Sequence, residues 1–134
     1  MRLRNYLKLL LFLALFGGLN ARLVDEQKAE EVAINWQTYQ LRDDLTIDKN
    51  FPIEYGKNTV LYAITFEENK GFVFVSGNDA TIPILGYSRT GTLPETWDNP
   101  EFNSVLDWYK TEIDYVTAHD LDNEATIDLW NDCD

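Results

Sequence analysis

The chain has 134 residues, with 23 acidic and 11 basic side chains and a formal net charge of −12 at pH 7. This length is enough for one domain with a modest core. Because affinity for nucleic acids depends on lysine and arginine side chains that neutralise phosphates, so acidic a chain is a poor candidate for binding DNA or RNA.

The start of the chain has the layout of a secretory signal peptide. Three basic residues precede an apolar run over residues 9–16, and small residues lead up to Ala21. A run of this length is far shorter than the ~20 apolar residues that span a bilayer, which favours a signal peptide over a membrane anchor. We therefore expect residues 1–21 to be removed and residues 22–134 to form an exported domain, periplasmic or secreted, with no stable membrane span.

An amphipathic helix is predicted from Asp25 to Gln40, with Asp25 as its N-cap. Apolar residues recur there at spacings of three and four: Ala29, Val32, Ala33, Trp36 and Tyr39. Residues 42–51 are predicted to form a polar connection. A short strand is predicted at residues 52–55.

Three strands of an antiparallel meander are predicted at residues 59–66, 71–75 and 82–87. In the first, alternation places Val60, Tyr62, Ile64 and Phe66 on one face, and Leu61 and Ala63 on the other. Asn69 and Gly71 suit the positive φ angles of the hairpin between the first two strands. Pro83 cannot donate a ladder hydrogen bond, so the third strand lies at a sheet edge or begins there.

A second long helix is predicted to begin near Pro100, with Asn99 as N-cap and Glu101 in its first turn. Its apolar stripe is Phe102, Val105, Leu106, Tyr109, Ile113 and Val116. A short last helix over residues 124–130 is expected to pack through Ile127 and Trp130. The predicted fold is α+β: an antiparallel sheet of three to four strands, packed with an N-terminal helix and a second long helix after the meander.

The stretch from Gly71 to Gly91 carries a distinctive motif, GFVFVSGND followed by PILGYSRTG. Here the chain resembles the propeptides of the streptopain family of cysteine peptidases and the free-standing inhibitors that look like those propeptides. Weaker similarity extends from about residue 24 to about residue 130. A zymogen of that family would continue into a catalytic domain, whereas this sequence ends at Asp134. The resemblance implies a non-covalent inhibitor of a streptopain-like cysteine peptidase, which we expect to be a monomer when free.

The resemblance also implies an inhibitory loop, which corresponds here to PETWDNPE, residues 94–101. In streptopain-like zymogens the matching loop enters the active-site cleft and displaces the catalytic histidine. The expected inhibitory residues are Trp97, Asp98, Asn99, Pro100 and Glu101. Asn99 and Glu101 are the candidates to probe the cleft, and Trp97 is a possible interface anchor. Structural roles stay open beside these: Asn99 as a helix cap, Glu101 at the helix dipole, and Trp97 against the core.

No catalytic or cofactor-binding pattern stands out, so we predict that the chain is not an enzyme and needs no cofactor. Nucleophilic catalysis by cysteine would have to use Cys133 and His119, which lie near the chain end and at a predicted helix end. The abundant carboxylates match no calcium loop, and one cysteine with one histidine gives no zinc spacing. Cys133 is expected to be a frayed terminal thiol without a role, with a disulfide-linked dimer as the alternative.

Two other interpretations of function remain. The chain could be an orphan prodomain or a truncated zymogen that acts as a folding chaperone or has no activity. It could also be an exported surface-binding module with no peptidase partner.

Overall fold

The computed structural model describes residues 23–93 and 99–133 of the chain. Its elements are α2 (Glu26–Tyr39), β1 (Ile47–Tyr55), β2 (Asn58–Phe66), the 3₁₀ turn η1 (Glu67–Asn69), β3 (Phe72–Ser76), β4 (Ile84–Ser88), α3 (Pro100–Ala118) and α4 (Glu124–Asn131). The strands form one antiparallel sheet in the order β1-β2-β3-β4. The predicted α+β fold is confirmed.

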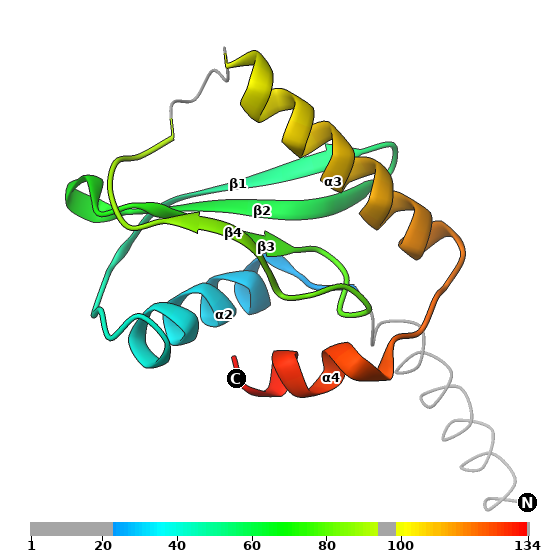
Figure 1. Ribbon diagram of the computed structural model, residues 1–134, viewed down its shortest axis with the longest axis horizontal. Helices are drawn as coiled ribbons and strands as arrows, with labels where there is room; N and C mark the ends of the chain where they lie inside the picture. Colours follow the sequence, from blue (N-terminus) through cyan, green and yellow to red (C-terminus); the bar gives the residue numbers. More distant parts are fainter. Residues whose placement is uncertain (1–22, 94–98, 134) are drawn as a thin grey trace, which may run out of the picture.

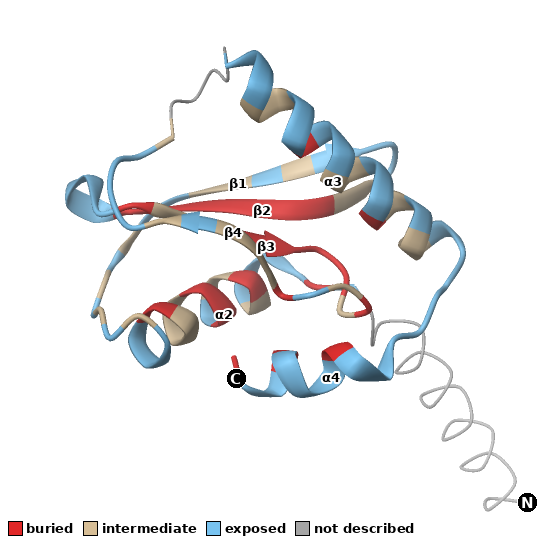
Figure 2. Ribbon diagram, in the orientation of Figure 1, coloured by how far each residue is buried: buried red, intermediate tan, exposed pale blue. Residues whose placement is uncertain are grey.

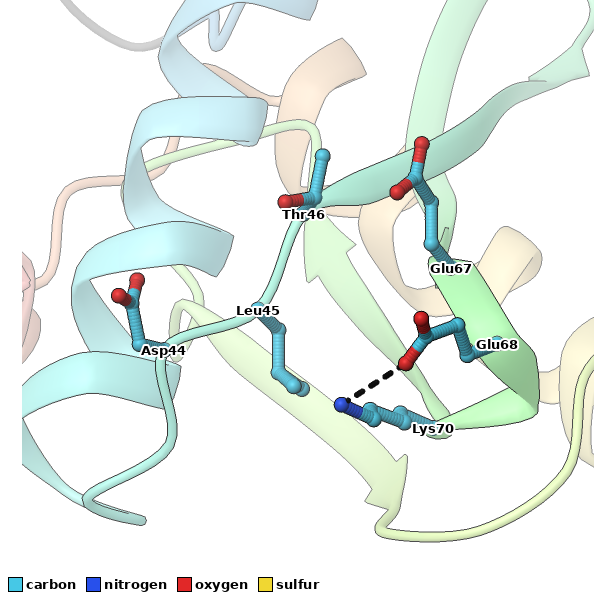
Figure 3. Close-up of a pocket in the computed structure, with 6 residues that line it drawn as sticks. All are labelled: Asp44, Leu45, Thr46, Glu67, Glu68 and Lys70. Atoms are coloured by element: carbon cyan, nitrogen blue, oxygen red, sulfur yellow. Dashed lines mark ion pairs between the residues drawn. The ribbon is translucent and has the colours of Figure 1, made fainter.

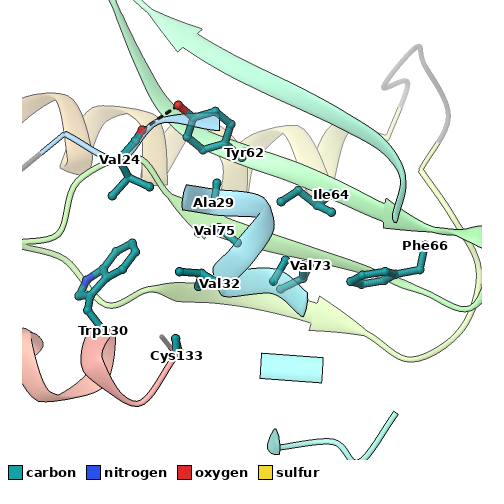
Figure 4. Close-up of a cluster of buried hydrophobic side chains, with 11 residues drawn as sticks. Val24, Ala29, Val32, Tyr62, Ile64, Phe66, Val73, Val75, Trp130 and Cys133 are labelled. Carbon is teal, nitrogen blue, oxygen red and sulfur yellow. Dashed lines mark hydrogen bonds between the residues drawn. The ribbon is translucent and has the colours of Figure 1, made fainter. Parts of the chain in front are cut away.

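Helices cover both faces of the sheet, so the protein has two hydrophobic clusters (Figure 1). Helices α2 and α4 lie on one face, and α3 crosses the other. Strand β2 is buried over most of its length, because it lies between paired neighbours and under helices on both sides (Figure 2). The cluster under α2 takes Tyr62, Ile64, Phe66, Val73 and Val75 from the sheet (Figure 4). The cluster under α3 contains Val60, Leu61, Ala63, Phe74, Leu106 and Ile113.

Helix α2 forms where the apolar spacing predicted it. The Asp25 side chain caps it by accepting a 2.7 Å hydrogen bond from the backbone N–H of Lys28. Ala29, Val32 and Ala33 are fully buried against the sheet. The stripe ends earlier than expected, because Tyr39 is 58% exposed while Gln37 takes a buried position on the helix.

The assignment of β2 side chains to faces is confirmed except at Val60. A register shift lies between Ile53 and Glu54 of β1, which pair with Leu61 and Thr59 of β2. Val60 is thereby skipped in the pairing, and it joins the same cluster as Leu61 instead of the cluster of Tyr62. A shifted register moves side chains to the opposite face, and the alternating pattern alone does not reveal it.

Strand β1 corrects the prediction of a polar connection over residues 42–51 followed by a short strand. It covers nine residues and pairs with β2 from Ile47 to Tyr55. Polar residues occupy it because it is an edge strand with one side open to solvent. Pro52 is tolerated for the same reason, since an edge strand needs ladder donors on only one side. Phe51 and Ile53 pack on the cluster under α3.

The hairpin between β2 and β3 uses positive φ angles, as predicted. The angle is 62° at Glu68, 55° at Asn69 and 107° at Gly71. A Cβ at Gly71 would lie 2.0 Å from the carbonyl oxygen of Ser88. Gly71 is therefore required both by its backbone angle and by the close approach of the neighbouring strand.

Strand β4 starts at Ile84, directly after Pro83, and forms the second edge of the sheet. This confirms the prediction that the strand containing Pro83 lies at a sheet edge or begins at the proline. The predicted start at Ile82 is two residues too early, and Ile82 is 49% exposed. The carbonyl of Pro83 still accepts a 2.9 Å hydrogen bond from the N–H of Ser76, so the proline contributes its acceptor to the sheet.

Helix α3 begins at Pro100 with Asn99 as N-cap, as predicted, and runs to Ala118. Leu106 and Ile113 are its buried residues. Phe102 and Tyr109 are half-buried against the same cluster. Val105 is 52% exposed and does not belong to the buried stripe, contrary to the prediction.

Helix α4 fixes the C-terminal part of the chain against α2. Trp130 is buried, and its indole N–H donates a 2.8 Å hydrogen bond to the carbonyl of Thr81. The predicted contact through Ile127 is wrong, because Ile127 is 50% exposed. The prediction of a frayed Cys133 is also wrong. Cys133 is 5% exposed in the cluster under α2, and its carbonyl accepts a 3.0 Å hydrogen bond from the Asn35 side chain.

Candidate functional site

The predicted inhibitory residues lie between β4 and the first turn of α3. Trp97 and Asp98 lie outside the described residues. Asn99, Pro100 and Glu101 are described, and all three are exposed. They occupy one end of α3, on the side of the sheet opposite α2 and α4 (Figure 1).

The side chain of Asn99 caps α3. Its Oδ1 accepts a 3.0 Å hydrogen bond from the N–H of Phe102. Its backbone carbonyl accepts a 2.9 Å bond from the N–H of Asn103 and so starts the helical ladder. Pro100 supplies a φ angle suited to the first helical position, and Glu101 places a negative charge at the positive end of the helix dipole. The structural roles considered for Asn99 and Glu101 are therefore present.

The two ends of this segment are anchored to one hydrophobic cluster. Leu93 and Phe102 both pack on the cluster under α3. The ring of Phe102 lies 5.4 Å from the ring of Phe74 in β3, centroid to centroid. Leu93 and Phe102 are thus both fixed to the core, and the exposed residues Asn99, Pro100 and Glu101 lie directly before one of these two contacts.

Hydrogen bonds also hold the turn that leads into the segment. The N–H of Gly91 donates to the carbonyl of Asn69 at 2.8 Å, and the N–H of Gly71 donates to the carbonyl of Gly91 at 2.8 Å. The Ser88 hydroxyl donates to the carbonyl of Thr90 at 2.8 Å. Gly91 has a φ of 80°, which favours glycine there. These bonds join the turn after β4 to the hairpin between β2 and β3.

The other conspicuous loop, residues 76–79, is occupied by contacts inside the protein. Asn78 is 2% exposed, and its Oδ1 accepts a 2.8 Å hydrogen bond from the N–H of Ala80. Its Nδ2 donates a 3.0 Å bond to the Thr117 hydroxyl of α3. The Thr126 hydroxyl of α4 donates a 2.8 Å bond to the carbonyl of Asp79. These contacts give the loop a structural role and leave its side chains little freedom to meet a ligand.

A polar pocket of about 210 Å³ lies where β2 ends and the chain enters β1 (Figure 3). Asp44, Glu67 and Glu68 contribute carboxylates to its wall, and Lys70 contributes an ammonium group. Lys70 Nζ lies 3.0 Å from Glu68 Oε2, and both side chains are more than half exposed. An ion pair this exposed is screened by water, and it gives the pocket no strong preference for an ionic ligand.

The described residues contain no group suited to metal or thiol chemistry. Among residues 23–93 and 99–133, no three acidic, histidine or cysteine side chains are placed to hold a metal ion. Burial raises the pKa of the Cys133 thiol, and the nearby Asp132 carboxylate acts in the same direction. A thiol that stays protonated is a poor nucleophile. His119 stacks on Tyr115, with ring centroids 4.0 Å apart. No helix in the described part of the chain is long and apolar enough to cross a membrane.

Comparison with known proteins identifies a family. A family model described as Spi protease inhibitor matches residues 21–113, well over half of the chain. The matched range runs from before α2 into α3 and includes the whole segment between β4 and α3. Comparisons with curated proteins and with solved structures gave no match.

Proposed function

Because the chain belongs to the Spi protease inhibitor family, we propose that it inhibits a streptopain-like cysteine peptidase by binding in the active-site cleft without a covalent bond. Membership of a family of protease inhibitors implies a protease as partner, and the chain is not an enzyme. The observation that carries the proposal is the family match over residues 21–113, which includes residues 94–101. The resemblance of the Gly71–Gly91 motif to streptopain propeptides supports the proposal that the target is a peptidase of that class.

The mechanism we propose is physical separation of the catalytic pair. A cysteine peptidase needs an imidazole beside its thiol, both to form the thiolate and to protonate the leaving group. A loop that enters the cleft and holds the histidine away from the cysteine removes both functions at once. In this proposal Asn99 and Glu101 reach into the cleft, and Trp97 contacts its rim.

The anchored base of the loop supports this mechanism. Ordering a flexible side chain on binding costs ~0.5 to 1.5 kcal/mol. Asn99 is already held by its bond to the N–H of Phe102, and Pro100 restricts the backbone beside it. A loop held in this way at its C-terminal end has less entropy to lose when it enters a cleft.

The proposed setting is outside the cytoplasm. The signal-peptide pattern of residues 1–21 would send the protein to the compartment into which a streptopain-like peptidase is exported. There it would silence peptidase that becomes active too early.

The test is a titration of the purified protein into an active streptopain-like cysteine peptidase with a fluorogenic peptide substrate. Loss of activity at a one-to-one ratio is expected. Glu101→Ala is expected to weaken inhibition. No inhibition by folded protein at micromolar excess would contradict the proposal for that peptidase and favour an orphan prodomain or a surface-binding module.

Two substitutions at Asn99 separate a role in the cleft from helix capping. Asn99→Ala removes both the cap and the amide, whereas Asn99→Ser keeps a good capping oxygen and removes only the amide. If the amide enters the cleft, both variants inhibit more weakly than the original protein. If only Asn99→Ala is weaker, the residue acts through the cap. Asp25→Ala, which removes the N-cap of α2 on the other side of the sheet, is the matched control.

A further inference from the structure

An apolar groove lies between α3 and the chain entering β4. It has a volume of about 400 Å³ and is lined by Ile82 and Leu85 on one side, and by Trp108, Tyr109 and Glu112 of α3 on the other. The Tyr109 hydroxyl donates a 3.0 Å hydrogen bond to the carbonyl of Leu85, which fixes the helix to the strand. The groove is therefore part of the folded scaffold.

Large apolar side chains at this groove are exposed. Trp108 is 62% exposed and Ile82 is 49% exposed, although both line the same groove. One turn before Trp108 on α3, Val105 is 52% exposed. Isolated exposed apolar residues are ordinary on a protein surface, whereas neighbouring ones around a groove mark a site of interaction.

The exposed apolar residues Val105 and Trp108 lie on the same flank of α3 as Glu101, one of the proposed inhibitory residues. Glu101, Val105, Trp108 and Glu112 follow one another at spacings of four, three and four, so they lie along one flank of α3. All four are exposed. Glu101 to Trp108 spans about 10 Å along the helix axis at ~1.5 Å per residue. A partner that holds Glu101 in its cleft would thus bring the rim of that cleft close to Trp108.

The charge along the flank indicates the chemistry of the partner. The apolar residues Val105 and Trp108 are framed by the carboxylates of Glu101 and Glu112, and the whole chain has a formal net charge of −12. Such a surface complements an apolar side chain that has lysine or arginine residues beside it. A second copy of the chain would bring the same carboxylates to the contact, and like charges disfavour that pairing.

We propose that this flank of α3, with the groove beside it, is a second contact surface for the peptidase, where an apolar side chain with basic neighbours on the cleft rim packs against Trp108. The inference rests on the proposed function, because it takes the peptidase as the partner. It adds an anchor outside the inhibitory loop. Tryptophan in such a position is typical of residues that dominate binding energy.

Trp108→Ala in the purified protein tests the anchor, measured by inhibition of the same peptidase with the same fluorogenic substrate. The inhibition constant is expected to rise about 30-fold or more, the loss typical of an interface hot spot. The matched control is Tyr39→Ala, since Tyr39 is 58% exposed on α2 at the opposite face of the sheet. This control is expected to leave inhibition unchanged. Circular dichroism and thermal unfolding of both variants check that they are folded.

Charge reversal tests the basic neighbours. Glu112→Lys is expected to slow association at low salt, with a smaller effect at high salt, because rim charges act mainly on the association rate. Glu31→Lys is the control, because Glu31 is an exposed residue of α2 and lies away from the groove. It makes the same charge change and is expected to have less effect on the association rate.

The outcomes separate this inference from the proposed function. If the original protein does not inhibit the peptidase, the proposed function fails and this inference fails with it. If the original protein inhibits and Trp108→Ala inhibits as well as Tyr39→Ala, only the second contact surface is refuted. A concentration-dependent dimer in sedimentation that Trp108→Ala abolishes would assign the groove to a second copy and overturn the inference.

Discussion

Asn78 and Thr117 join two parts of the chain that are 39 positions apart. The Asn78 Nδ2 donates a 3.0 Å hydrogen bond to the Thr117 Oγ1, which ties the loop after β3 to the last turns of α3. The same Thr117 hydroxyl donates a 2.8 Å bond to the carbonyl of Ile113 in its own helix. The position of α3 on the sheet is thus set by a polar contact as well as by apolar packing.

Replacing Asn78 with alanine is expected to lower the free energy of unfolding by about 2 to 3 kcal/mol. The substitution removes the acceptor for the N–H of Ala80 and the donor for Thr117, and it leaves both partners without these bonds. Denaturant unfolding measures the change. Asn131→Ala, at an exposed position of α4, is the control and should stay within about 0.5 kcal/mol of the original protein. Equal effects at the two positions would contradict the role given to Asn78.

Gly77→Ala is expected to destabilise the fold by about 1 to 3 kcal/mol or more, because it forces backbone atoms apart. A Cβ at Gly77 would lie 2.5 Å from the carbonyl oxygen of Thr59 and 2.9 Å from the carbonyl carbon of Val60. Gly86→Ala is the control. A Cβ there would meet its nearest atom, in the Phe74 side chain, at an ordinary 3.6 Å. Thermal unfolding should show a large loss at Gly77 and little change at Gly86, and the reverse order would refute the packing argument.

Gln37→Met is expected to leave stability unchanged or to raise it by about 1 kcal/mol. Gln37 is 1% exposed, and its Nε2 is buried without a hydrogen-bond partner. Methionine fills a similar volume without a buried amide to desolvate. Gln27→Met, at an exposed position in the first turn of α2, controls for the change in composition. A clear loss of stability in Gln37→Met, measured by urea unfolding, would mean that the amide makes a contact worth more than its desolvation.

Stability is expected to fall at alkaline pH, because two buried groups hold their protons more tightly in the folded state. Burial raises the pKa of Tyr62, whose hydroxyl donates a 2.7 Å hydrogen bond to the carbonyl of Val24. Burial also raises the pKa of Cys133. The folded protein therefore binds more protons than the unfolded chain once the pH passes the ordinary values of about 8.5 for cysteine and 10 for tyrosine. The stabilisation from these two groups is complete at pH values below the ordinary pKa values of the unfolded chain. It is lost as the pH rises through the raised pKa values of the folded protein.

Unfolding measured from pH 7 to about pH 11 checks this expectation. Tyr62→Phe removes one of the two titrations and should flatten the loss of stability above about pH 10. Cys133→Ala should flatten it at lower pH. A loss of stability that is identical in the original protein and both variants would assign the pH dependence to other groups.

Local sequence signals predicted the elements that local chemistry determines. Asp25 and Asn99 were recognised as caps because the capping oxygen, the acid in the first turn and, at α3, the proline lie within a few residues. Gly71 was placed in a turn because the residues around it form a hairpin pattern.

The errors arose where distant contacts decide the structure. Strand β1 is polar enough to resemble a connection, and it is a strand because β2 offers it a ladder of hydrogen bonds. Cys133 is buried because Asn35 and Trp130 hold the end of the chain against α2. The choice of Trp130 over Ile127 as the buried side chain of α4 depends on an acceptor at Thr81.

Only part of the candidate site could be predicted from the sequence. The inhibitory segment was found because its residues are contiguous and match a family pattern, and the capping role of Asn99 was among the alternatives. The groove beside Trp108 was missed, because it exists only when α3 packs against the chain entering β4. The spacing of apolar residues wrongly assigned Val105 to the buried stripe of α3, because the direction in which the helix is turned on the sheet leaves Val105 as well as Trp108 exposed.

The anchoring of Leu93 and Phe102 in a single cluster has an evolutionary consequence. Because Leu93 and Phe102 pack on the same cluster, residues between them in the sequence can be exchanged while the packing of the domain is kept. The choice of target can then change faster than the fold. A few substitutions between Leu93 and Phe102 could therefore change which peptidase the protein binds. The fold would still be held by the sheet and by the buried faces of the helices, while the exposed flank of α3 that contains Trp108 would have to match the new target as well.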